Sequence, residues 1–270
     1  MTEKNNAEKT ADLLGKIREQ RPLIHHITNF VVMNSTANVT LAIGASPIMS
    51  HAHEEMEEIQ EFASALNLNI GTLTNYWVES MIKAGEAAGK KGTPIILDPV
   101  GAGATSLRTK AALNIIVSVP VKVIRGNASE VMSLSGDDFQ IKGVDSLEKV
   151  ESAREGARRL AKKLGKVLAI TGEIDFVTDG DRDYEIHNGD EMFGNVTGTG
   201  CSATTAVSCF NAVESDAAFA TAAALGYFGF AGEIAAKNSN GPGGFQSALY
   251  DALYNIKTED IIDGVKIKQI

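Results

Sequence analysis

The chain of 270 residues is 44% hydrophobic and 22% charged, which excludes a disordered or fibrous protein and indicates a folded one with a sizeable core. Its formal net charge of −9 disfavours nucleic acid and an anionic membrane surface as partners, because both are bound by clustered basic side chains. Small phosphate-bearing ligands are not excluded, since backbone N–H groups hold phosphate without basic residues.

The N-terminal segment has no apolar signal core, and we expect no apolar run long enough to cross a membrane. The first seven residues are polar, so we expect them to be frayed. Cys201 and Cys209 are the only cysteines of the sequence, and on one helix they would lie about 12 Å apart, too far for a disulfide. These features favour a location in the reducing cytoplasm.

Short apolar runs alternate with segments of helical periodicity through the first two thirds of the chain. The apolar runs are residues 22–28, 45–50, 65–71, 93–100, 121–127 and 166–172, and the helical segments are 31–44, 53–64, 75–92, 105–119 and 146–165. This alternation is typical of right-handed βαβ units. It predicts a single α/β domain over residues 1–270, with a central, mostly parallel β-sheet flanked by helices on both faces.

The last third of the chain has a different pattern. In residues 175–189, apolar and polar residues alternate on either side of an Asp-Gly-Asp turn, which predicts an antiparallel hairpin at the edge of the sheet. From Thr199 the chain is expected to turn helical, with helical segments over residues 201–213 and 215–238, where alanine, serine and glycine allow close helix packing. The sequence Gly-Pro-Gly-Gly-Phe at 241–245 predicts a sharp break before a final helix.

Polar residues and glycines stand repeatedly where a predicted strand ends. These positions are Asn29, Gly71, Asp98, Arg125, Asn127 and Thr171, with Glu130 just beyond. The carboxyl ends of parallel strands meet at one edge of a sheet, where ligands bind, so we expect a site there. Asp98 and Glu130 suit magnesium, and Arg125 suits a phosphate. Taken alone, Asp98 could be a strand-end turn or a helix cap, although its neighbours favour the magnesium role, and Thr171 could equally be a capping residue.

Residues 198–201, Gly-Thr-Gly-Cys, place permissive backbone directly before a predicted helix. Such a turn lets successive N–H groups point at one spot with the positive end of the helix dipole behind them, which makes an anion hole. In a phosphoryl-transfer enzyme, the turn Gly198, Thr199 and Gly200 would stabilise the moving phosphoryl group. A helix N-terminus also lowers the pKa of a thiol, so we expect Cys201 to be more thiolate-like than a free cysteine.

Two other nucleotide-binding patterns fit less well. The stretch "GAGATS" at 101–106 lacks the lysine and the spacing of a Walker A loop. The stretch "GTGCSA" at 198–203 formally matches the dinucleotide fingerprint GxGxxA, but it lies in the last third of the chain without a strand-end acid at the required place. A nicotinamide-dependent oxidoreductase is therefore a minor alternative.

The order of these features resembles the ribokinase-like small-molecule kinases. Most members of that superfamily carry an aspartate after the glycine turn, and the cysteine here points to one branch. The segments "HHITNFVVMNSTANVTLAIGASPIMS", "NIGTL", "ILDPVGAGAT", "IRGNASE", "ITGEIDFV", "NVTGTGC" and "GPGGF" together resemble the hydroxyethylthiazole kinases of thiamine salvage, from about Pro22 to Phe245. One difference is Thr199, which stands at a place often filled by alanine.

This resemblance implies ATP- and magnesium-dependent phosphorylation of the alcohol of 4-methyl-5-(2-hydroxyethyl)thiazole. It implies that the thiazole is bound by Met49, Asn29, Gly71 and Gly198, ATP by Arg125, Thr171 and Asn127, and magnesium by Asp98 and Glu130, with Cys201 in the catalytic position beside Gly198, Thr199 and Gly200. The family is trimeric, with thiazole pockets between neighbouring subunits, so we expect a homotrimer. Without the resemblance, Met49 is an ordinary core residue.

Two further functions stay open beside this one. A related kinase for another vitamin precursor, such as a hydroxymethylpyrimidine, would share the same strand-end residues. A catalytically silent sensor of thiazole or nucleotide would share the pocket, although the near-complete set of Asp98, Asn127, Glu130 and Cys201 argues against a loss of activity.

Overall fold

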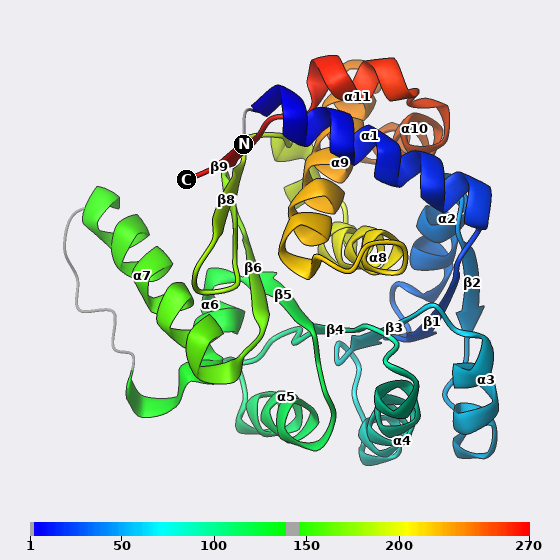
Figure 1. The fold of residues 1–270 in the computed structure, drawn as a ribbon, viewed down its shortest axis with the longest axis vertical. Coiled ribbons are helices and arrows are strands. Elements are labelled where there is room, and N and C mark those ends of the chain that lie inside the picture. The colour runs from blue at the N-terminus through cyan, green and yellow to red at the C-terminus, as the bar shows by residue number, and fades with distance from the viewer. Residues whose placement is uncertain (1–2, 139–145) are drawn as a thin grey trace.

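A sheet of nine strands forms the centre of the computed structural model, which describes residues 3–138 and 146–270 (Figure 1). In spatial order the strands are β2 (Ser46–Met49), β1 (Leu23–Ile27), β3 (Ala65–Asn69), β4 (Ile95–Asp98), β5 (Val123–Asn127), β6 (Val167–Thr171), β7 (Asp175–Thr178), β8 (Asp183–Ile186) and β9 (Ile267–Gln269). The strands from β2 to β6 pair in parallel. Those from β6 to β9 pair antiparallel.

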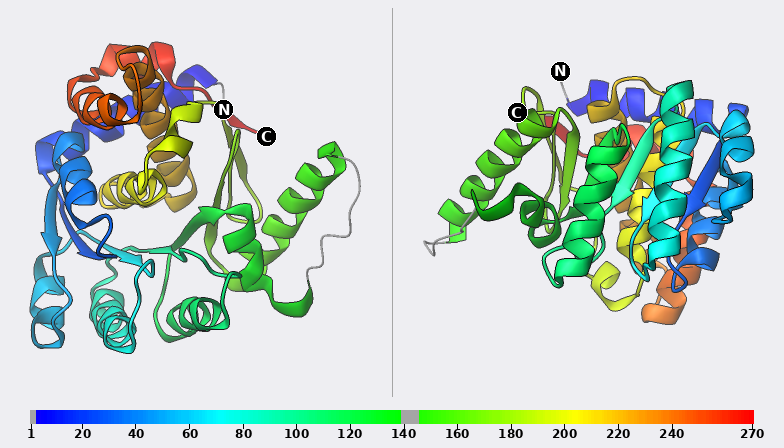
Figure 2. Two further views of the ribbon diagram at one scale, coloured as in Figure 1. Left: turned by 180° about the vertical axis from the view of Figure 1, so that it is seen from behind. Right: turned by 90° about the horizontal axis from the view of Figure 1, so that it is seen from below.

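Helices cover both faces of this sheet, as the alternating pattern predicted (Figure 2). One face carries α3 (Met56–Phe62), α4 (Asn75–Lys91), α5 (Ser106–Ser118), α6 (Ala128–Met132) and α7 (Ser146–Leu164), with two 3₁₀ turns at His53–Glu55 and Ser133–Asp138. The other face carries α1 (Glu3–Gln20), α2 (Met33–Ile43), α8 (Thr199–Asn211), α9 (Ala217–Lys237), α10 (Pro242–Asn255) and α11 (Thr258–Gly264), with a 3₁₀ turn at Glu191–Asn195.

Two hydrophobic cores result, one on each side of the sheet. In β4 the side chain of Ile96 belongs to the core under α8 and α9, whereas Ile95 and Leu97 belong to the core under α4 and α5. A strand buried on both faces has no solvent side, which explains why this segment is apolar throughout rather than alternating.

Helix α9 corrects one expectation from the sequence. It is the one helix of the described chain that is long and apolar enough to cross a membrane, although we expected no such run. Of its most apolar window, 83% is buried inside the protein. Its mixture of alanines, glycines and aromatic residues therefore fills the core beside α8 and α10.

The N-terminal segment also differs from expectation. Residues 3–7 are not frayed, because α1 begins at Glu3 and both Asn6 and Ala7 are buried. The Asn6 side-chain amide donates a hydrogen bond to the carbonyl of Ile267 in β9, at 3.1 Å. Helix α1 packs against α11, and the two ends of the chain lie close together (Figure 1). A polar sequence is compatible with burial here because the N–H group of the Asn6 amide finds a partner in β9.

The C-terminal segment contains more secondary structure than the sequence predicted. Pro242 is the first residue of α10 rather than part of a break before it, since proline fits the first turn of a helix. Helix α11 and strand β9 follow, and neither was predicted. The β7–β8 hairpin is antiparallel as predicted, but β9 lies outside it as the edge strand.

Close packing of α4 against the loop before β5 gives a test of this core. A β-carbon on buried Gly85 would lie 2.7 Å from Cγ1 of Val119. We therefore expect Gly85→Ala to lower the free energy of unfolding by about 1–3 kcal/mol, through overpacking. Gly15 of α1 is the matched control, because nothing lies within 4 Å of its added β-carbon. Gly15→Ala should raise the unfolding free energy by about 0.5–1 kcal/mol.

Chemical denaturation of both variants measures these changes. Equal effects of the two substitutions would contradict the packing described for α4.

Candidate active site

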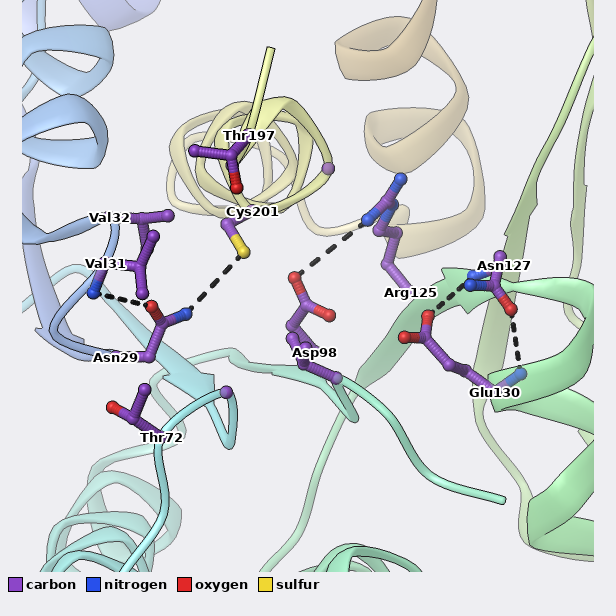
Figure 3. A pocket seen from close by; sticks show the side chains of 14 residues that line it. Asn29, Val31, Val32, Thr72, Asp98, Arg125, Asn127, Glu130, Thr197 and Cys201 are labelled. Carbon is purple, nitrogen blue, oxygen red and sulfur yellow. Dashed lines mark hydrogen bonds and ion pairs between the residues drawn. The ribbon is translucent and has the colours of Figure 1, made fainter. Parts of the chain in front are cut away.

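A pocket of about 370 Å³ lies between the carboxyl ends of the parallel strands and the N-terminus of α8 (Figure 3). Nine of the site residues predicted from the sequence line it: Asn29, Gly71, Asp98, Arg125, Asn127, Glu130, Gly198, Gly200 and Cys201. The other lining residues were not singled out by the sequence analysis, and they are Val31, Val32, Thr72, Val100 and Thr197. The structure thus brings together most of the residues that stand at the ends of the predicted strands.

Four neighbouring strands each present one polar side chain to the α8 side of the sheet at this end. These side chains are Asn69 of β3, Asp98 of β4, Arg125 of β5 and Thr171 of β6. Asn69 and Asp98 are direct partners in the parallel register. Because side chains alternate between the faces of a strand, the register of the sheet itself brings these groups together.

The Asp98 carboxylate is almost fully buried, with 1% of the residue exposed. Its Oδ2 accepts hydrogen bonds from the Thr204 hydroxyl at 2.8 Å and from Nδ2 of Asn69 at 3.1 Å, and lies 4.0 Å from Nη1 of Arg125. Burial raises the pKa of this carboxyl to about 6, although the Arg125 charge and the hydrogen bonds act in the opposite direction. The partners present therefore compensate the buried charge only in part, which suits a further cation.

Arg125 presents hydrogen-bond donors to the pocket wall. Its Nη2 donates to the Thr171 hydroxyl at 2.6 Å, while its Nε has no hydrogen-bond partner among the described residues. A guanidinium carries five N–H groups and no acceptor, so donors are left for a ligand rich in oxygen atoms. Figure 3 shows the guanidinium beside Asp98 and facing the same space.

Asn127 and Glu130 form a capping box at the start of α6. The Asn127 side chain accepts from the backbone N–H of Glu130 at 2.9 Å, and Glu130 Oε2 accepts from the backbone N–H of Asn127 at 3.0 Å. The other carboxylate oxygen of Glu130 accepts from the N–H of Gly101 at 2.8 Å. Glu130 thereby joins the loop after β4 to the start of α6, and its orientation in the pocket is fixed.

Helix α8 begins at Thr199, as the sequence predicted, directly after Gly198. The φ angle of Gly198 is 83°, in the left-handed region, and an added β-carbon would lie 2.5 Å from Cγ1 of Val32. Both conformation and space therefore require glycine there. No described side chain caps this helix, so its first N–H groups are available to a ligand.

Cys201 lies in the first turn of α8, and its sulfur faces the pocket (Figure 3). It accepts from Nδ2 of Asn69 at 3.2 Å and lies 3.8 Å from Nδ2 of Asn29. The expectation of a thiolate is wrong. Burial and the neighbouring Asp98 charge raise the pKa of the thiol to about 12, and they outweigh the Asn69 hydrogen bond and the Arg125 charge. The helix N-terminus cannot offset the loss of water at this depth.

Three residues named from the sequence do not line this pocket in the single chain. Met49 ends β2, the outer parallel strand, where it pairs with His26. Thr171 lies behind the Arg125 guanidinium and accepts its hydrogen bond. The Thr199 hydroxyl donates to the backbone carbonyls of residues 193 and 196, which directs it into the preceding turn.

The sequence analysis missed Asn69 and Thr204, although both bond to Asp98. Asn69 belongs to the run "ALNLNIG", where asparagine stands at two alternate positions of a buried strand. That alternation was an available signal of a polar face. Thr204 follows Cys201 by three residues on α8, which places both on one side of the helix.

Comparison with known proteins identifies the family. A model of the hydroxyethylthiazole kinase family matches residues 14–259. The chain belongs to this family. The hydroxyethylthiazole kinase of Desulfosudis oleivorans is 61% identical over 272 residues, which cover 100% of this chain and 99% of the relative. That of Desulfotalea psychrophila is 52% identical over 259 residues, which cover 96% of this chain and 95% of the relative.

Solved structures agree with the assignment to the hydroxyethylthiazole kinase family. The hydroxyethylthiazole kinase protein of Pyrococcus horikoshii OT3 is 43% identical, with a TM-score of 0.90 over 97% of this chain and 99% of that one. The pyridoxal kinase of Staphylococcus aureus is 16% identical, with a TM-score of 0.62 over 92% of this chain and 97% of that one, a likeness of fold alone. The ribokinase-like fold and the family resemblance found in the sequence are both confirmed.

The oxidoreductase alternative is not supported. A dinucleotide fingerprint requires a strand that runs into the glycine turn and a helix that leaves it. In this hydroxyethylthiazole kinase family member, the 3₁₀ turn Glu191–Asn195 precedes the "GTGCSA" stretch instead.

The raised pKa of Cys201 gives a pH dependence that can be measured. A thiol with a pKa of about 12 holds little thiolate at neutral pH, so alkylation by iodoacetamide should be slow and should rise about tenfold per pH unit from pH 7 to pH 9.5. A free cysteine would begin to level off near its pKa of about 8.5. Peptide mapping by mass spectrometry follows the reaction at Cys201.

Buried Cys209 provides the internal control, together with a Cys201→Ala variant that assigns the signal. A rate of Cys201 alkylation that is already level below pH 8 would show that the helix N-terminus prevails over burial.

Proposed function

We propose that the protein transfers the terminal phosphoryl group of ATP to the hydroxyl of 4-methyl-5-(2-hydroxyethyl)thiazole, the reaction named by its family. The observation that carries the proposal is the uncapped N-terminus of α8, which faces the buried Asp98 carboxylate across the pocket in a chain of this family. The N–H groups and Arg125 supply positive potential for the transferred group, and Asp98 supplies a negative group opposite them.

The acceptor is proposed to bind on the side of the pocket formed by Asn29, Gly71, Val31 and Val32. The valine side chains offer apolar surface to a methylthiazole ring, and the asparagine amide offers polar contacts. Gly71 keeps this wall close, because a β-carbon there would lie 2.5 Å from Nδ2 of Asn29. Gly198 borders the same space from α8.

Met49 would enter this pocket from a neighbouring subunit of a homotrimer. Support for such an interface comes from exposed apolar side chains around the β2 edge of the sheet. Phe30 is 62% exposed, Phe62 66% and Tyr76 44%. The unpaired edge of β2 adds free backbone groups to this surface. Light scattering that reports a stable monomer would remove this part of the proposal.

The nucleotide is proposed to bind on the Arg125 side. The Nη N–H groups of Arg125 that are not bonded to Thr171 suit phosphate oxygens, with Thr171 holding the guanidinium in place. Asn127 lies next to them at the pocket wall. The pyridoxal kinase of Staphylococcus aureus, which shares the fold, was solved with AMP-PCP and pyridoxal. This is consistent with the binding of a nucleotide by a protein of this fold.

Magnesium fits the side chains that are present. Asp98 is a buried carboxylate whose charge is only partly compensated, and Glu130 offers the remaining lone pairs of a carboxylate held by two backbone N–H groups. Among the described residues there is no group of three His, Cys, Asp or Glu that could form an all-protein metal cage. One or two carboxylates, with phosphates and water completing the shell, are what Mg²⁺ prefers. When bound, the ion would neutralise phosphate charge.

The chain's own groups then have separate tasks in the transfer. The first N–H groups of α8 hold the phosphoryl oxygens, and Arg125 orients the phosphates. The Cys201 thiol stays protonated at neutral pH, so it contributes contact and shape rather than a strong base. This is sufficient in a loose transition state, where positioning carries most of the catalysis and the hydroxyl proton leaves late. We infer a cytoplasmic location, because ATP is the donor and both cysteines are free thiols.

A coupled assay of ADP release tests the proposed reaction. Wild-type protein with ATP and magnesium should release ADP in the presence of hydroxyethylthiazole and not without an acceptor, and mass spectrometry should identify the phosphorylated thiazole. Asp98→Asn removes the buried negative charge and should lower kcat by about 100-fold or more. Turnover with hydroxymethylpyrimidine alone would keep the site but change the substrate, and no turnover with either would favour the silent sensor.

Gly200 gives a second test, aimed at the nucleotide side. A β-carbon on Gly200 would lie 2.9 Å from Nη1 of Arg125, while the helical backbone accepts alanine. Gly200→Ala should therefore displace the guanidinium and raise the KM for ATP about tenfold, with the melting temperature within about 2 °C of wild type.

Gly194→Ala is the matched control, because nothing lies within 4 Å of its added β-carbon. Its KM for ATP should equal that of the wild type. An unchanged KM in the Gly200 variant would place the nucleotide away from Arg125.

A further inference from the structure

Asn69 occupies the point where the two halves of the pocket meet. It is the last residue of β3 and is 2% exposed. Its Nδ2 donates to Oδ2 of Asp98 at 3.1 Å and to Sγ of Cys201 at 3.2 Å. Its Oδ1 accepts from the backbone N–H of Gly71 at 3.0 Å and from Nδ2 of Asn29 at 2.7 Å. A primary amide has two N–H groups and two lone pairs, and all four are used.

The orientation of this amide is fixed by chemistry. The backbone N–H of Gly71 can only donate, so the amide oxygen must face it. The amide nitrogen then has to face Asp98 and Cys201, and each of its two N–H groups reaches one acceptor. A flipped amide would lose the Gly71 bond and would oppose its oxygen to the Asp98 carboxylate.

We propose that Asn69 is the positioning residue of the phosphoryl transfer, which fixes the separation of the Asp98 carboxylate and the Cys201 sulfur and thereby the place of the acceptor hydroxyl. The role rests on the function proposed above. Asn69 does not line the pocket and acts through the two groups that do. Figure 3 shows Asn29, Cys201 and Asp98 around the space that the hydroxyl would occupy.

Among the described side chains, only Asn69 bonds to both Asp98 and Cys201. Asp98 would keep Thr204 and Arg125 if Asn69 were truncated. Cys201 would keep, among the described side chains, only the 3.8 Å contact of Asn29. Asn29 would lose the Asn69 oxygen that its Nδ2 bonds to and would keep the backbone N–H of Val31 on its own oxygen. The sulfur and the acceptor wall would therefore move relative to a carboxylate that stays in place.

Asn67 offers a matched control in the same strand. It lies two residues before Asn69, on the same face of β3, and is also 2% exposed. Its Nδ2 contacts Nδ1 of His26 at 3.2 Å and the Thr205 hydroxyl at 3.5 Å. Truncation of either asparagine removes a buried amide from one strand, but only Asn69 bonds to Asp98 and Cys201 within the described part of the chain.

The test compares Asn69→Ser with Asn67→Ser in the ADP-release assay. Asn69→Ser should lower kcat about 50-fold or more while the KM for ATP changes less than about threefold, because misplacement at the reacting atoms affects the chemical step. Asn67→Ser should keep kcat within about threefold, although both variants should lower the melting temperature. Asn69→Asp keeps the two accepted hydrogen bonds, loses both donated ones, and should lower kcat to the same extent.

Two results would overturn the proposal. One is a kcat within about threefold of wild type for both Asn69 variants. The other is a loss of kcat in Asn67→Ser equal to that in Asn69→Ser, which would mark a merely structural role. If wild type phosphorylates no acceptor, the proposed function fails, and a crystal structure of Asn69→Ser or Asn69→Asp decides the positioning role separately. A shift of the Cys201 sulfur from Asp98 of more than about 0.5 Å supports it, and unchanged positions contradict it.

Discussion

The contact between α8 and the middle of the sheet is made by hydrogen bonds, and the pocket depends on it. At the pocket, Asn69 of β3 and Asp98 of β4 bond to Cys201 and Thr204 in the first two turns of the helix. Larger apolar side chains pack further along α8, in the core that contains Val207 and Phe210. Hydrogen bonds are directional where apolar contacts are not, so this polar contact sets both the depth and the rotation of the helix N-terminus.

A separate buried network, whose residues do not line the pocket, joins β3 to α2 through Asn67. Nδ1 of His26 accepts from Asn67, and its Nε2 donates to the Thr40 hydroxyl, which itself donates to the carbonyl of Thr36. Burial keeps His26 neutral by lowering its pKa to about 3, which preserves this pattern of one donor and one acceptor. Helix α2 begins directly after Val32, at the pocket wall. This buried network therefore holds α2 against β1 and β3.

Most of the fold could be predicted from the sequence, and so could most of the polar residues that line the pocket, but not the hydrogen bonds that join them. Alternation of apolar and helical segments predicts the parallel strands, and the strand-end rule selects Asp98, Arg125 and Glu130 because parallel strands share one edge. Asn69 could not be recognised as a link, because its partners come from distant segments that only register and helix rotation bring together. The pKa of Cys201 was misjudged because a helix-end argument contains no measure of burial depth. Strand β9 is too short to give a periodic pattern.

The meeting of α1 with α11 and β9 has a consequence for how the chain folds as it is made. The core under α4 and α5 consists of residues between 27 and 168, so all of its parts are present well before synthesis ends. The core under α8 and α9 includes Ala7 and Ile267 and cannot close before both exist. Of the described elements, α1 therefore leaves the ribosome before its partners α11 and β9, which are made last among them. Its apolar face is the surface that a chaperone would meet on the nascent chain.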